Sequence, residues 1–398
     1  MDFSLTRRQQ ELARIYRDIG LRHVRQPLRE GFDWNAWRAI SDAGLWRLAV
    51  PRELGGAGGS WLDFAAAFEA LAGTMRSIGF AMATANQAAL IHALVTYGTR
   101  EQHDSVLARL MAGEAGATAI SERGTGTEIR ALQTALTENA HGYRLNGNKY
   151  NISLGPQAAL LLVAARHDDS ARSDSERSTI ALVLVDTTLP GVARSEPQST
   201  LGVRDLPVGE LNFEAVPITH ESLLGAPRDG GKALQRIASM NRACFGLLCA
   251  DVVQPFLTDA LAYAGARTIL DVPIDTHQHV QRRLVDIRMR AERSRWMALA
   301  ALAQLLDAHP AALENCSIAK LAAAHDLMCS AIDLLALHGS NGYRSGTVST
   351  FAADALAMVS AGGTEEMHRR NIFAQMQRRL DGGKRKPAHA PQPTSTPA

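Results

Sequence analysis

The chain has 398 residues, of which 46% are apolar and 21% are charged, and its formal net charge is +2 at pH 7. This length predicts two or three domains, and the small net charge gives no strong field for nucleic acid or a membrane surface, so we expect neither partner. The 4 cysteines form no Cys-x-x-Cys pair, which predicts buried, reduced thiols. We expect no signal peptide and no apolar stretch long enough to cross a bilayer, and therefore a cytoplasmic protein.

Residues 1–115 are predicted to form a helical domain. "SLTRRQQELARIYRDIGLRHV" and "NAWRAISDAGLWRLAV" carry apolar residues at helical spacing, and "PRELGGAGGS" ends the second segment with Pro and Gly. A long Ala-rich helical pair and the segment "REQHDSVLARLMAGEA" follow.

Residues 116–225 have a different sequence pattern from the preceding region, and this pattern predicts an antiparallel β domain. "YRLNGNKYNISL", "ALLLVAAR", "STIALVLVD" and "VGELNFEAVPI" are rich in β-forming residues and are separated by Gly, Pro, Asn and Asp. "DDSARSDSERS" is expected to be a polar surface loop between two strands.

The helical period returns over residues 226–382, which are predicted to form a four-helix bundle. "DTHQHVQRRLVDIRMRAERSRWMALAALAQLLDA" is expected to be a very long amphipathic helix, and "NCSIAKLAAAHDLMCSAIDLLALHG" is another that ends at a glycine. Residues 383–398 are rich in Pro, Ser, Thr and Ala and predict a disordered tail. The predicted fold class is therefore α+β, mainly α.

Seven segments in this order resemble landmarks of the acyl-CoA dehydrogenase flavoprotein family. They are "GLWRLAVPRELGGAG", "AISERGTGTEIRAL", "YRLNGNKYNISLG", "LGVRDLPVGELNFEAVPI", "ARTILDVPIDTHQ", "LHGSNGY" and "GGTEEM". One short glycine motif is weak evidence, but seven in order along nearly the whole chain are strong evidence for the fold and weaker evidence for the chemistry. The resemblance implies FAD as cofactor.

The resemblance also implies which residues contact FAD. These are Ser121, Thr127, Ile152, Ser153, Arg267, Gln278, Gly339, Thr364 and Glu366. Hydroxyl groups such as Ser121 and Ser153 are suited to donate hydrogen bonds to a flat heterocycle, whereas an ordinary Ser/Thr/Gly loop is the simpler explanation of spacing alone. Arg267 and Gln278 match residues that in the family reach the FAD of a neighbouring subunit, which implies a homodimer or homotetramer. Asn151 stands where the family usually has an aromatic residue.

The family reaction removes an α-proton from an acyl thioester, and a positioned carboxylate takes that proton. In most members the carboxylate is a Glu at the position of Gly362, and in a subgroup it is a Glu at the position of Asn241, just before an Arg. Neither position is acidic here, and Asn does not accept a proton at neutral pH. Asp251, Glu365 and Glu366 are the next acidic residues to consider. Thr127, Arg242 and the backbone N–H of Gly362 are expected to hold the substrate.

The leading interpretation is an FAD-dependent oxidoreductase that acts at the α,β-carbons of an acyl-CoA or acyl-carrier-protein thioester and passes electrons to an electron-transfer flavoprotein. One alternative is a specialised flavoprotein of natural-product biosynthesis that performs oxygenation, isomerisation or ring closure. Another is a catalytically silent binding subunit. No metal is expected.

Overall fold

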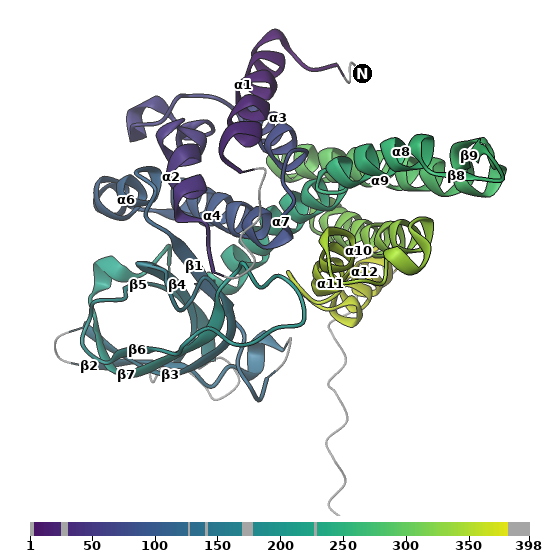
Figure 1. Cartoon of the computed structure of the whole chain (residues 1–398). Coiled ribbons are helices and arrows are strands. Elements are labelled where there is room, and N and C mark those ends of the chain that lie inside the picture. Colours follow the sequence, from purple (N-terminus) through teal and green to yellow (C-terminus); the bar gives the residue numbers. More distant parts are fainter. Residues whose placement is uncertain are drawn as a thin grey trace, which may run out of the picture.

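The computed structural model describes residues 4–24, 31–125, 128–139, 142–168, 178–226 and 229–380. Figure 1 shows two helical regions with a curled sheet packed beside the first. The first region contains α1 (Arg7–His23), α2 (Trp34–Asp42), α3 (Trp61–Ala72), α4 (Ile78–Tyr97), α5 (Arg100–Gln102) and α6 (Ala108–Met111). Side chains just before three of these helices, Thr6, Ser60 and Ser77, accept hydrogen bonds from the first turn and fix where each helix begins.

Helix α4 is apolar on all sides, as is typical of a helix surrounded by protein. By length and hydropathy, Ile78–Tyr97 and Gly230–Ala266 pass the test for a membrane span, which corrects the expectation that no segment does. However, 89% and 72% of the residues in their most apolar windows are buried inside the fold. Both segments are therefore explained as core helices of the fold.

The sheet contains seven strands: β1 (Gly116–Ala119), β2 (Ala135–Asn139), β3 (Gly142–Ser153), β4 (Leu160–Asp168), β5 (Ser178–Asp186), β6 (Val192–Arg194) and β7 (Val208–Ile218). The path runs β1-β4-β2-β3-β7-β6, and β5 pairs with the other edge of β4. Most pairs are antiparallel, as predicted, but β1 and β2 both run parallel to β4. Local sequence pattern does not reveal this because strand direction depends on which distant strands become neighbours.

The C-terminal region contains α7 (Gly230–Asp251), α8 (Gln254–Ala266), α9 (Gln278–Leu306), α10 (Ala312–Leu337), α11 (Thr347–Ala357) and α12 (Glu365–Leu380). Helices α7, α9 and α10 pack against one another, while α8 runs beside α9 in an arm. A small hairpin of β8 (Thr268–Ile269) and β9 (Val272–Pro273) closes the arm (Figure 1). The predicted class, with an N-terminal helical part, a β part and a C-terminal helical bundle, is confirmed; the expected tail at 383–398 lies outside the described residues.

Two buried carboxylates lie where the β region meets the C-terminal helices. Asp354 on α11 accepts a 2.6 Å hydrogen bond from the backbone N–H of Val203, and Asp205 accepts from the Ser77 hydroxyl and, at 3.2 Å, from the backbone N–H of Phe80. Burial raises the pKa of Asp354 to about 7, with the nearby Asp205 adding to the rise. The fold thus holds a proton on Asp354 that the unfolded chain releases at lower pH.

We expect Asp354→Asn to make the protein more stable at about pH 8 than the wild type, with a clearly smaller difference at about pH 5. Between the ordinary carboxyl pKa and about 7 the folded state binds the extra proton, so wild-type stability falls as pH rises through this window. The amide keeps an oxygen for the Val203 N–H and never ionises. Thermal unfolding of both proteins at the two pH values measures this, and an equal difference at both would contradict it.

Candidate functional site

The two positions at which a catalytic carboxylate was expected lie side by side. Gly362 is in the loop between α11 and α12, with φ of +70°, and a Cβ built on it would lie 3.4 Å from Oδ1 of Asn241 and 3.1 Å from the Phe245 ring, both on α7. Asn241 Nδ2 in turn donates a 2.6 Å hydrogen bond to Oδ1 of Asn86 on α4. The fold therefore brings the Gly362 loop to the seam between α4 and α7.

The backbone N–H of Gly362 donates to no acceptor within the described part of the chain, and the residue is exposed. The following residue, Gly363, has φ of +115°. A left-handed backbone of this kind is costly for residues with a Cβ, so the two glycines allow the loop to present a bare N–H. Such a group is suited to bind a carbonyl oxygen or a developing oxyanion.

A buried basic cluster supports the loop from the protein interior. Lys320 on α10 donates a 2.9 Å hydrogen bond to the Gly363 carbonyl, and burial lowers its pKa to about 8. Arg242 contacts the Met367 sulfur at 3.5 Å, and its Nε has no partner among the described groups. Arg242 and Asn241 are sequence neighbours on a helix and so point in different directions. Arg242 therefore contacts the segment that follows the loop, through Met367, and points away from the Asn241–Asn86 hydrogen bond.

His368 is fully buried in the same cluster and is the one unassigned residue with base chemistry beside the loop in the described structure. Neither ring nitrogen meets the geometry of a hydrogen bond with a described residue, and Nε2 lies 3.2 Å from the Cβ position built on Gly363. Burial, and next the positive charges of Arg242 and Lys320, lower its pKa to about 3. The backbone groups of Gly363 and Gly362 are nevertheless close enough to raise the pKa of the ring in part. A third positive charge at this place is unfavourable, so His368 is a poor proton acceptor.

The three acidic residues that the sequence left as candidates do not face Asn241 and Gly362. Asp251 is ten positions beyond Asn241 on α7, about 15 Å along the helix axis, and is buried near Glu69. Glu365 is in an ion pair with Arg369, and Glu366 is exposed. The hydrogen bonds that lower the pKa of Glu366 come first from its own backbone N–H and then from Thr364.

The strand expected to contact the flavin has a bulge immediately before Ile152 and Ser153. Its register with β7 shifts between Lys149 and Ile152, and Asn151 has φ of +57°, a conformation that Asn tolerates better than most residues. Ile152 is buried in the core of the sheet and therefore offers only its backbone to a ligand. The hydroxyl of Ser153 is half-buried and makes no hydrogen bond to a described residue.

Ser121 lies next to this strand, as the resemblance requires. Its carbonyl accepts a 2.8 Å hydrogen bond from the backbone N–H of Tyr150, and its own side chain is exposed. Thr127, the other expected hydroxyl of this loop, lies outside the described residues. The Ser121 loop is therefore held beside β3, the strand that ends at Ser153, and both hydroxyls make no hydrogen bond to a described residue.

A buried ion pair that sequence reasoning missed ties these two segments together. Lys149 Nζ lies 2.8 Å from Oε1 of Glu122 and donates a 3.0 Å hydrogen bond to the Ile120 carbonyl. Glu122 also accepts hydrogen bonds of 2.7 and 3.0 Å from the backbone N–H groups of Gln133 and Thr134. The available signal was the charged Lys149 at an inward-facing position of an alternating strand.

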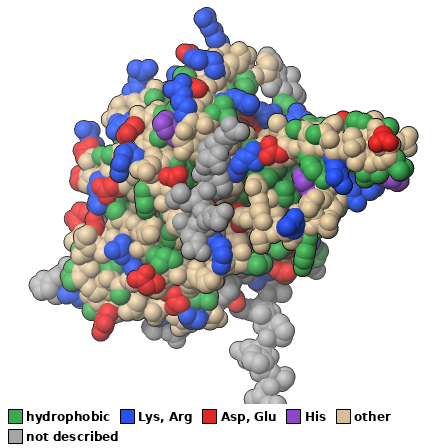
Figure 2. All heavy atoms as spheres, viewed as in Figure 1, with side chains coloured by type: hydrophobic (Ala, Val, Ile, Leu, Met, Phe, Trp, Pro, Cys, Tyr) green, Lys and Arg blue, Asp and Glu red, His purple; other side chains and the backbone are tan. Residues whose placement is uncertain are grey.

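The remaining expected FAD contacts lie elsewhere in the molecule. Arg267 and Gln278 are exposed at the far end of the α8–α9 arm, where apolar and acidic side chains gather (Figure 2). The hairpin there turns through Leu270 and Asp271, with φ of +52° and +64°, and Leu270 is 90% exposed. Gly339, with φ of +58°, follows α10. A strained, exposed leucine at the end of an arm is typical of a segment that contacts another surface.

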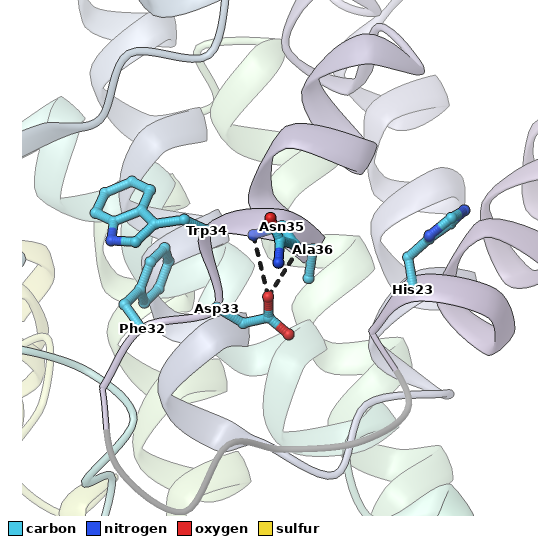
Figure 3. A pocket seen from close by; sticks show the side chains of 6 residues that line it. All are labelled: His23, Phe32, Asp33, Trp34, Asn35 and Ala36. Atoms are coloured by element: carbon cyan, nitrogen blue, oxygen red, sulfur yellow. Dashed lines mark hydrogen bonds between the residues drawn. The ribbon is translucent and has the colours of Figure 1, made fainter.

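A hollow lies at the start of α2 (Figure 3), and none of the groups described above lines it. It is lined by His23, Phe32, Asp33, Trp34, Asn35 and Ala36. The carboxylate of Asp33 accepts hydrogen bonds from the backbone N–H groups of Asn35 and Ala36, so it already serves as the cap of α2. We assign the hollow no function.

The candidate groups for a cofactor and a substrate are thus the Ser121 and Ser153 hydroxyls beside β3 and the glycine loop beside the seam between α4 and α7. Family profiles for the N-terminal, middle and C-terminal domains of acyl-CoA dehydrogenases match residues 6–114, 117–216 and 228–377. The chain therefore belongs to the acyl-CoA dehydrogenase family.

Individual relatives of this chain carry the names of different dehydrogenases. It is 28% identical to the "Probable acyl-CoA dehydrogenase YngJ" of Bacillus subtilis over 94% of this chain and 100% of that protein. It is 26% identical to the "L-prolyl-[peptidyl-carrier protein] dehydrogenase" of Pseudomonas fluorescens, over 87% of this chain and 90% of that protein. A solved structure of an FAD-dependent dehydrogenase has a TM-score of 0.87 and 25% identity, and it covers 95% of this chain and 100% of its own.

FAD is the cofactor of this protein, and the described residues fit it. The Ser121 and Ser153 hydroxyls have no partner among the described residues, and both belong to segments that meet at β3 beside its bulge. Uncommitted donors of this kind match the hydrogen-bond acceptors of a flavin ring. When bound, FAD accepts a hydride at flavin N5.

Proposed function

We propose that this protein oxidises the α,β-bond of an acyl thioester carried by CoA or by an acyl carrier protein, without a carboxylate at either of the family's usual base positions. The observation that carries this proposal is the free N–H of Gly362 beside the Asn241–Asn86 amide pair. The N–H would bind the thioester carbonyl and stabilise the enolate that forms when the α-proton leaves.

The residues around the loop have complementary roles in this proposal. Lys320 holds the Gly363 carbonyl and so anchors the loop that carries the Gly362 N–H. Asn241 orients the substrate but takes no proton. The α-proton passes to water or to a group on the substrate itself, so an ordinary straight-chain substrate, whose α-proton is only weakly acidic, reacts slowly.

The experiment is an anaerobic titration of the FAD-loaded protein with a panel of thioesters, followed by the flavin absorbance. Bleaching by any member supports oxidation at the α,β-carbons. No bleaching, together with turnover that requires oxygen and reduced flavin, would instead support a specialised flavoprotein of natural-product biosynthesis. That alternative is favoured by one observation, the amide at the base position. A protein that neither bleaches nor turns over would be a silent binding subunit.

We further propose a cytoplasmic homodimer or homotetramer that passes electrons to an electron-transfer flavoprotein. The support for the oligomer is the exposed arm, which ends at the β8–β9 hairpin, away from α11 and α12 (Figure 1). Arg267 and Gln278 are both exposed next to this hairpin. Arg binds pyrophosphate through two nitrogen atoms at once, which suits a contact with a neighbour's FAD.

We expect Arg267→Ala to weaken FAD binding by about ten- to a hundredfold, as for loss of a charge-assisted hydrogen bond. The exposed Arg344, which lies after α10, provides a matched control as Arg344→Ala. Flavin fluorescence gives the dissociation constant, and sedimentation gives the oligomeric state. Unchanged FAD affinity in the Arg267 variant, or FAD-loaded wild type that is purely monomeric at micromolar concentration, would remove the support for this contact.

A further inference from the structure

The side-chain amides of Asn86 on α4 and Asn241 on α7, here called the amide pair, have a donor and an acceptor that no described residue binds. Asn241 Nδ2 donates to Asn86 Oδ1 at 2.6 Å. Asn241 Oδ1 and Asn86 Nδ2 make no hydrogen bond to any described residue, and Asn241 Oδ1 lies 3.4 Å from the Cβ position built on Gly362. One open acceptor and one open donor thus stand beside the free Gly362 N–H.

The residues of α4 around the amide pair are mostly apolar. On α4 the residues on both sides of Asn86, from Ile78 to Ala85 and from Gln87 to Leu94, are buried, and most are apolar. Asn86 and Asn241 themselves are half-buried, so a ligand can reach their open amide atoms. A single shared bond leaves one donor and one acceptor of the pair without a protein partner, and a ligand that supplies both a donor and an acceptor would complete it.

The charged residues near the amide pair limit which chemical groups of a ligand can bind there. Arg242 is directed to the Met367 sulfur behind the loop, and Asp251, Glu365 and Glu366 do not face the pair. An ammonium group placed here would have no described carboxylate to balance it, and burying an unpaired charge is costly. A hydroxyl is neutral and both donates and accepts one hydrogen bond.

We propose that the acyl group bound here carries a hydroxyl on its α- or β-carbon, which accepts from Asn86 and donates to Asn241. This inference rests on the proposed function, because it assumes that a thioester carbonyl binds the Gly362 N–H. It makes Asn86 and Asn241 specificity-determining residues for a hydroxyacyl thioester, as distinct from an unsubstituted acyl or an aminoacyl thioester.

The test is calorimetric binding of four CoA esters to the FAD-loaded protein under anaerobic conditions: butyryl, 2-hydroxybutyryl, 3-hydroxybutyryl and 2-aminobutyryl. We expect one hydroxy ester to bind about tenfold or more tightly than butyryl-CoA, as for two added hydrogen bonds. Equal affinity for the butyryl and hydroxy esters, or tightest binding of the amino ester, would overturn the inference while the proposed function stands. If no ester binds, and carrier-protein forms of the same acyl groups also fail, the proposed function falls as well.

Variants connect the preference to the amide pair. Asn241→Leu and Asn86→Leu should each remove most of the hydroxy preference, because the hydroxy esters should lose more affinity than butyryl-CoA does. The chain offers a matched control, since Asn315 Nδ2 donates to Gln304 Oε1 at the same distance of 2.6 Å between α10 and α9. Asn315→Leu loses an equivalent amide pair and should keep the preference. Asn241→Asp, which preserves shape if a Leu variant fails to fold, should shift the preference toward the amino ester; a preference that survives this change would contradict the assignment.

Discussion

Asn241→Glu should accelerate anaerobic flavin bleaching by butyryl-CoA by about a hundred- to ten-thousandfold, the usual contribution of a general base. Asn241 lies next to the Gly362 loop, so a side chain one methylene longer reaches the space where a Gly362 side chain would stand. Burial raises the pKa of such a carboxyl and brings it nearer to the working pH, where a base is most effective.

Two further variants show whether the gain comes from the carboxylate. Asn241→Gln has the same length without the charge and should give no acceleration. Gly362→Glu puts the carboxylate on the loop, but the φ of +70° and the Phe245 ring 3.1 Å from its Cβ make it costly. We expect a smaller gain and a lower melting temperature for it. Fast bleaching by the wild type, or equal acceleration by the Gln variant, would show that proton removal does not depend on these positions.

Lys149→Met should lower the free energy of unfolding by about 3–5 kcal/mol, as expected when one partner of a buried ion pair is removed. Lys149 is completely buried, and Glu122 would remain buried without its cation. The Glu122 pKa is raised by burial, but hydrogen bonds, first from Lys149 and then from Thr134, bring it below its usual value, so the carboxylate is charged in the fold. FAD binding should weaken too, because the pair joins the Ser121 loop to the strand of Ser153.

The neighbouring ion pair between Arg123 and Glu210 provides the control. The Arg123 side chain is 66% exposed, so Arg123→Met should cost less than about 1 kcal/mol. Urea unfolding followed by circular dichroism measures both variants, and flavin fluorescence measures FAD release. The pair would have no special role if both variants lost equal stability. The double variant Glu122→Gln with Lys149→Met should recover part of the loss, since no charge is then left unpaired.

Sequence alone determined the order of the parts. Helical periodicity identified α4, α9 and α10, and alternation identified the long strands, because each follows from local chemistry repeated along the chain. It also showed that neither Gly362 nor Asn241 carries a carboxylate. Those statements concern residue identity and short-range pattern, and no knowledge of distant contacts is needed for them.

The tertiary structure decided which of these residues meet. The parallel pairing of β1 and β2 with β4, the Lys149–Glu122 ion pair and the contact of Asn241 with Asn86 all join residues far apart in sequence. The burial that makes His368 a poor base likewise depends on α7, α10 and α12 packing together. Hydrogen bonds and desolvation act through distance in space, so local pattern does not report them, and only the folded chain shows that the site holds an amide pair where a base was expected.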